Sequence, residues 1–160
     1  MREILFKAKP KDWREHLKEA GWVEGYYAMM GTDNLIRHYI VQNCALTRLF
    51  KNPEDNMYFN DVEIDPETLC QYTGLNDKNG KRIWEKDIIS INTYSYMEPE
   101  EDYFGQVVYA EGWACWCIQH PDDERPIPLC ECEGSYQTDR FIGGNIFDNP
   151  ELLGQDGEES

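Results

Sequence analysis

The sequence has no apolar run near the roughly 18–20 residues that a membrane-spanning helix requires. Its first residues, Met1 to Lys7, are too short and too charged to form the apolar core of a signal peptide. These two absences predict a soluble, intracellular protein with no membrane partner.

Basic residues are scarce, since 15 Lys and Arg stand against 31 Asp and Glu, for a formal net charge of −16. After residue 100 the only basic side chains are Arg125 and Arg140, against fourteen acidic ones. Lys and Arg supply most nucleic-acid affinity by neutralising phosphates, so we expect no direct nucleic-acid partner. The excess of acid serves solubility or attracts a basic partner protein, and the sequence leaves both interpretations open.

Intrinsic disorder is excluded by the 41% hydrophobic and 13% aromatic content of the 160 residues, which also fit one domain with a substantial core.

A phosphate-binding loop is absent from the sequence as well. Gly143-Gly144-Asn145 lacks both the lysine and the following helix that such a loop needs.

Short β-branched and aromatic segments separated by glycine, proline and asparagine dominate the chain. They predict a mainly β (α+β) fold, with one sheet curled into a barrel or sandwich. Two small helices are expected over 11–20 and 66–72, the second because Asp65-Pro66-Glu67 combines an N-cap residue, a proline and an acid in the first turn. Asn79-Gly80 predicts a tight turn with positive φ angles. Strands are expected over 3–8, 22–29, 35–41, 45–50, 57–64, 82–91 (bent at Lys86-Asp87), 103–109, 112–118, 129–133 and 141–146. The turn residues Gly31-Thr32-Asp33-Asn34 are expected to join 22–29 and 35–41 as a hairpin.

Four blocks of the chain resemble the YopX family of bacteriophage and prophage proteins, namely Met1–Lys7, Trp22–Tyr27, Asp65–Ile88 and Gly143–Leu153. The resemblance implies a single curled mixed-sheet pseudobarrel over 1–153 and a place in the cytoplasm of the bacterial host. It implies no activity. Residues 154–160 are then expected to form a disordered acidic tail.

The chain departs from the YopX pattern at two places. The family usually has a short turn where this chain has the helix-like insert 10–20. It also usually has Glu-Gly-Asp where this chain has Glu85-Lys86-Asp87, and a glycine there permits a positive-φ bend.

Six cysteines raise the question of a metal site. Cys44 and Cys70 stand alone and are expected to be small buried side chains. The two Cys-x-Cys pairs predict a symmetric hairpin with Cys115 opposite Cys132 and Cys117 opposite Cys130. Because Cys-x-Cys on flat strands is expected to spread the sulfurs too widely for zinc, we expect no metal and no cofactor. If zinc were bound, its ligands would be Cys115, Cys117, Cys130 and Cys132.

Three function classes remain. The first is a non-enzymatic phage or prophage accessory protein that binds a basic host or defence protein through acidic loops, with homo-oligomerisation left open. The second sequesters a signalling nucleotide or metabolite, with Trp22, Tyr26 or Trp84 for stacking and Lys81 or Arg82 for phosphate. The third, an enzyme, has no candidate catalytic residue, because the three histidines lie in no catalytic motif. The candidate contacts of the first class are Glu98, Glu100, Glu101, Asp102, Asp122, Asp123 and Glu124.

Overall fold

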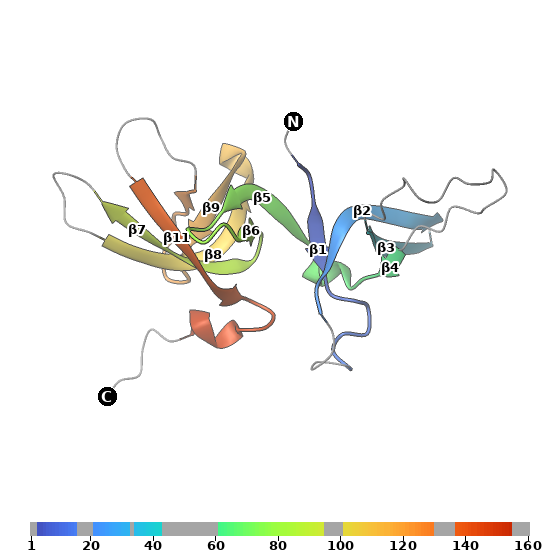
Figure 1. The fold of residues 1–160 in the computed structure, drawn as a ribbon. Helices are drawn as coiled ribbons and strands as arrows, with labels where there is room; N and C mark the ends of the chain where they lie inside the picture. The colour runs from blue at the N-terminus through green and yellow to red at the C-terminus, as the bar shows by residue number, and fades with distance from the viewer. Residues whose placement is uncertain are drawn as a thin grey trace. The chain divides into compact units, whose positions relative to one another are not determined.

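The computed structural model describes residues 3–15, 21–32, 34–42, 61–94, 101–129 and 137–154. The chain divides into two compact units, 1–71 and 72–160, each described by itself below (Figure 1). Strands dominate both units, which confirms the mainly β prediction. Every strand pairing among the described residues is antiparallel, so the expectation of a mixed sheet is wrong. The expected strand 45–50 and residues 155–160 of the expected tail 154–160 lie outside the described residues.

The described strands follow one another along the chain, with two short 3₁₀ turns between them and a third after the last strand. The strands are β1 (Phe6–Ala8), β2 (Val23–Thr32), β3 (Leu35–Val41), β4 (Asp61–Glu63), β5 (Cys70–Asn76), β6 (Arg82–Trp84), β7 (Asp87–Tyr94), β8 (Glu101–Ala110), β9 (Cys115–Gln119), β10 (Ile127–Pro128) and β11 (Gln137–Asn145). The turns are η2 (Pro66–Thr68), η3 (Glu111–Trp113) and η4 (Pro150–Leu153).

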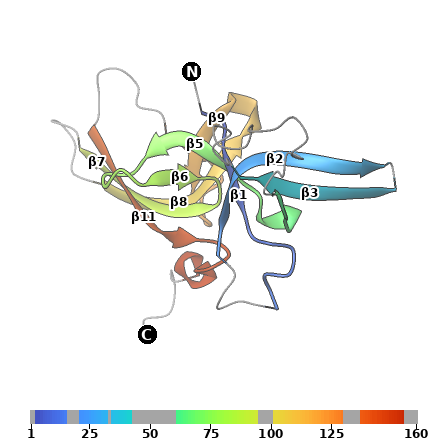
Figure 2. The same cartoon turned by 45° about the vertical axis from the view of Figure 1, so that its right-hand side comes forward.

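The first unit is built on the β2–β3 hairpin, which the sequence predicted and Figure 2 shows as two adjacent ribbons. The register runs from Tyr26 opposite Val41 to Thr32 opposite Leu35. β1 pairs with β2 on one side and with the start of β5 on the other, and β4 pairs with β3. A small core forms where Ala8, Ile40 and Ile64 are buried together, with partly buried aromatic and aliphatic side chains around them.

The two expected helices are not found among the described residues. Residues 11–15 form turns, with the Trp13 amide donating to the carbonyl of Pro10, and 16–20 lie outside the described residues. The second helix is only the 3₁₀ turn η2, because Leu69 is already extended and Cys70 pairs with Lys7 in β1. This strand pairing with a distant segment overrides the local helix signal.

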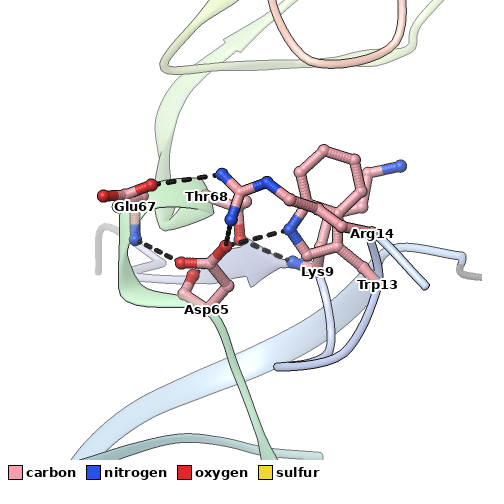
Figure 3. A network of polar contacts seen from close by, with 6 residues as sticks. All are labelled: Lys9, Trp13, Arg14, Asp65, Glu67 and Thr68. Atoms are coloured by element: carbon pink, nitrogen blue, oxygen red, sulfur yellow. Dashed lines mark hydrogen bonds and ion pairs between the residues drawn. The ribbon is translucent and has the colours of Figure 1, made fainter. Parts of the chain in front are cut away.

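The predicted N-cap is confirmed, and Figure 3 shows that it does more than start a turn. Asp65 Oδ1 accepts the Glu67 amide at 3.1 Å. Asp65 Oδ2 accepts Trp13 Nε1 at 2.9 Å and Arg14 Nη1 at 3.0 Å. Asp65 is buried, so these donors supply the hydrogen bonds that its carboxylate loses on leaving water. The cap therefore ties segment 10–15 to η2.

The second unit has the strand order β10-β9-β8-β7-β11 in its larger sheet (Figure 1). Its core contains Ile83, Ile89, Val107 and Ile118, each no more than 1% exposed, with further apolar side chains packed against them. The strand expected over 82–91 is interrupted between β6 and β7, as the predicted bend required. Lys86 sits in this turn with φ 66°, so the lysine adopts the conformation that the family's glycine permits.

Candidate interaction surface

Two acidic segments of the second unit meet at one end of its larger sheet. β8 and β9 are neighbours with Gln106 opposite Gln119, so the start of β8 faces the loop that follows β9. The Tyr103 hydroxyl donates to Asp123 Oδ2 at 2.8 Å and accepts the His120 amide at 3.1 Å. This hydroxyl joins the strand that carries Asp102 to the loop that carries Asp122, Asp123 and Glu124. We call these four acidic residues the acidic end.

The loop after β9 is fixed by its own side chains. The His120 ring lies edge-on to Phe104 with ring centroids 4.7 Å apart, and its Nδ1 accepts the Asp122 amide at 3.1 Å. The Gln119 side chain donates to the backbone carbonyls of His120 and Asp123. These bonds hold the loop backbone and the Asp123 side chain in place, so less ordering entropy is lost when a partner binds.

The carboxylates of the acidic end have no Lys or Arg partner among the described residues. All four residues are exposed, and among the described residues no Lys or Arg forms an ion pair with any of them, although His120 Nδ1 lies 3.9 Å from Asp122 Oδ2. The first unit differs in this respect. Glu63 lies 2.8 Å from Lys11, whose hydrogen bond lowers the pKa of the Glu63 carboxyl. Glu63 therefore has a cation beside it, whereas the described residues give the acidic end no Lys or Arg.

Tyr103 remains a hydrogen-bond donor at neutral pH. Burial raises the pKa of its hydroxyl, and the neighbouring Asp123 carboxylate raises it further, while the His120 amide acts in the opposite direction. A tyrosine has an ordinary pKa of about 10, so the raised value keeps the proton on the oxygen that faces Asp123. The link between the two acidic segments is thus stable across the physiological range.

The structure describes only part of the predicted acidic set. Asp122, Asp123 and Glu124 share one loop, which the Tyr103 hydroxyl joins to the start of β8, and Asp102 precedes Tyr103 on that strand. Glu98 and Glu100 lie outside the described residues, and Glu101 is described only through its backbone, which pairs with Thr93. Sequence reasoning missed Tyr103 and His120, which position the surface, because a tyrosine in a strand and an isolated histidine carry no local signal for this role.

The aromatic residues proposed for ligand stacking are not gathered within one unit. Trp84 is only 4% exposed and packs against Tyr72 with ring centroids 5.5 Å apart, so its faces are covered by the fold. Tyr26 is half exposed on β2. Trp22 lies beneath two ammonium groups, with Lys7 Nζ 4.6 Å and Lys9 Nζ 5.0 Å from its ring centroid. Lys81 and Arg82 both follow the turn that precedes β6 in the second unit, and Arg82 is the first residue of β6.

The predicted cysteine hairpin has a different register. Cys117 lies opposite Pro128, and the Leu129 amide donates to the carbonyl of Trp116 at 2.9 Å. The predicted pairing of Cys117 with Cys130 is therefore wrong by two residues, because the connecting loop is placed asymmetrically about Asp123-Glu124. Cys130 and Cys132 themselves lie outside the described residues.

A second expectation about the cysteines is also corrected. The Sγ atoms of Cys115 and Cys117 are 3.7 Å apart, so this Cys-x-Cys pair does not spread its sulfurs widely. In the described part of the chain, no group of three or more His, Cys, Asp or Glu side chains is arranged to hold a metal ion. The described segments likewise contain no helix of the length and apolarity that a membrane crossing would need.

The fold and the acidic end define a mainly β protein of antiparallel strands with an exposed anionic surface. Comparison with known proteins adds a family, since the model of the YopX protein family matches residues 21–154. The chain belongs to the YopX family, which confirms the resemblance seen in its sequence. No curated protein matches it.

Proposed function

We propose that this chain is a non-enzymatic phage or prophage accessory protein that binds a host or defence protein of the bacterial cytoplasm through its acidic end. The observation that supports the proposal most directly is the Tyr103–Asp123 hydrogen bond, because it holds the acidic loop 122–124 against the strand that carries Asp102 without supplying a cation. Like charges held side by side cost free energy, and a basic partner surface would remove that cost.

Charge at the acidic end would act mainly on the rate of association. A cluster of one sign raises the encounter rate with an oppositely charged partner by about 10 to 10³-fold, and salt weakens this effect. The field decays over a Debye length of about 8 Å at physiological ionic strength. Binding that depends on the acidic end should therefore weaken steeply between low and high salt.

The test has two steps. Affinity capture from a bacterial lysate at low and high salt identifies proteins retained only at low salt. Association of each is then measured with a variant in which the acidic end is neutralised by Asp102→Asn, Asp122→Asn, Asp123→Asn and Glu124→Gln. Asn at position 123 keeps an oxygen for the Tyr103 hydroxyl, so the loop should stay in place. We expect association at low salt to slow by about tenfold or more.

A matched control removes the same number of charges from exposed positions elsewhere, by Glu3→Gln, Glu15→Gln, Glu111→Gln and Glu151→Gln. The control should change the association rate much less, because its charges are spread over the surface. Equal effects of the two variants would show that net charge alone matters. No effect of either would show that the acid serves solubility, and in both cases the proposal fails.

Sequestration of a small anionic ligand remains the second candidate, because Trp22 lies under the ammonium groups of Lys7 and Lys9. Both lysines are buried, so a nucleotide would have to displace their ammonium groups from the ring before its base could stack there and its phosphate could contact them. A shift of the melting temperature by one nucleotide of a signalling-nucleotide panel, lost in Trp22→Leu, would favour this function. An unchanged melting temperature with every nucleotide of the panel would exclude this function.

A further inference from the structure

We propose that Cys115 and Cys117 form a dithiolate chelate for an exchangeable thiophilic dication such as Zn²⁺ or Cd²⁺. Both residues lie on β9, where side chains two residues apart point to the same face. Their sulfurs are 3.7 Å apart. Two thiolates bound to zinc at about 2.3 Å in tetrahedral geometry lie about 3.8 Å apart, so the pair already has the spacing of two zinc ligands.

The surroundings of the pair suit a neutral complex. Cys115 lies opposite Ala110 and Cys117 opposite Val108 on β8, with Pro128 opposite Cys117 on β10. These neighbours offer apolar side chains, which favour an uncharged group. When a dication binds, each thiol loses its proton to solvent and each sulfur donates an electron pair to the metal, so two protons leave and the complex of two thiolates with the dication is neutral.

The two thiols differ in their exposure to solvent. Cys117 is 0% exposed, whereas Cys115 is half-buried and open to an arriving ion. The described residues supply only these two ligands, since they contain no larger group of metal-binding side chains. The remaining coordination positions are open to water or to an incoming ligand. With only these two ligands, the proposed site would hold its ion less tightly than a closed four-ligand zinc centre and would exchange it.

Titration of the full chain with Co²⁺ and Cd²⁺, in the presence of a non-thiol reductant, tests the proposal. Thiolate coordination gives ligand-to-metal charge-transfer absorption with either ion, and tetrahedral Co²⁺ gives intense visible bands. We expect one ion per chain and the release of two protons, measured in weakly buffered solution. Loss of an outer-shell partner weakens metal binding by about 10- to 100-fold, so Cys115→Ser or Cys117→Ser should each cost more than about 100-fold in affinity.

Cys70→Ser is the matched control. Cys70 is buried, and its thiol donates to the carbonyl of Thr68 at 3.2 Å, which the serine hydroxyl can replace. This variant should bind the ion as the unmodified chain does. Far-ultraviolet circular dichroism identifies any variant that has lost its fold. In place of such a variant, the folded chain without substitutions is tested after alkylation of Cys115.

Three results would overturn the proposal. The first is the absence of charge-transfer absorption with both ions in the unmodified chain. The second is equal affinity of Cys115→Ser, Cys117→Ser and Cys70→Ser. The third is loss of binding in Cys130→Ser and Cys132→Ser but not in Cys115→Ser or Cys117→Ser, which would assign the ion to the other pair.

Discussion

Ala114 is expected to destabilise the protein through its backbone, and replacement by glycine should reverse this effect. The residue ends η3 in the left-handed conformation, with φ 52° and ψ 38°. That conformation costs an L-residue with a Cβ about 1–2 kcal/mol. Glycine avoids this cost but loses about 0.4–1 kcal/mol more conformational entropy on folding. Ala114→Gly should therefore raise the free energy of unfolding by about 0.5–1 kcal/mol, which is the difference between these two terms.

The same change at Ala110 provides the control. Ala110 precedes η3 with φ −85°, a value that any residue adopts, so Ala110→Gly should lower the free energy of unfolding by about 0.5–1 kcal/mol. Urea titration followed by circular dichroism measures both changes. For a chain of this size each kcal/mol shifts the melting temperature by about 2–4 °C, so calorimetry should show shifts of opposite sign. Destabilisation by both variants, or stabilisation by both, would refute the reasoning.

Three further predictions concern the backbone and one ion pair. Lys86→Gly should be more stable than Lys86→Ala by about 0.5–1 kcal/mol in urea titrations, because only glycine relieves the positive φ; equal stability would contradict this. Gly105→Ala should destabilise the protein by about 1–3 kcal/mol, since a Cβ there would clash with the Gln119 carbonyl oxygen, and a melting temperature equal to that of the unmodified chain would rule the clash out. The lowered pKa of Glu63 gives stability that is present above its ordinary value and lost as pH falls through the folded-state pKa. Glu63→Gln should therefore lose less stability than the unmodified chain on acidification from about pH 6 to about pH 3, and identical acid curves would exclude this role.

The features that the sequence predicted correctly depend on local chemistry. The hairpin of β2 and β3 follows from two apolar segments around Gly31, whose φ is 146°. Gly80 has the expected positive φ of 80°. Asn79 does not share this conformation, since the Asp77 side chain accepts its amide and shapes the turn instead. Cap and turn signals act over a few residues, so one segment suffices to predict them.

The features that were predicted wrongly depend on distant partners. The helix expected over 66–72 stops because Cys70 and Gln71 pair with β1, more than sixty residues earlier in the chain. Nothing within the segment shows this competition. The predicted cysteine register was wrong for a related reason. It assumed that the turn lies at the centre of the loop between the two strands, and nothing within the segment shows where the turn lies. A shift of two residues keeps each side chain on its face while changing every partner.

The acidic end shows the same limit in the candidate site. Charge counts predicted an acidic C-terminal part, yet they could not separate acids that have cations from acids that lack them. That difference arises from contacts between residues far apart, such as Lys11 with Glu63, 52 positions away, and Tyr103 with Asp123, 20 positions away. In the first contact a lysine cancels the charge, and in the second a neutral hydroxyl fixes the charge in place without cancelling it. Salt-dependent binding should therefore reside in the second unit, even though acidic residues occur throughout the chain.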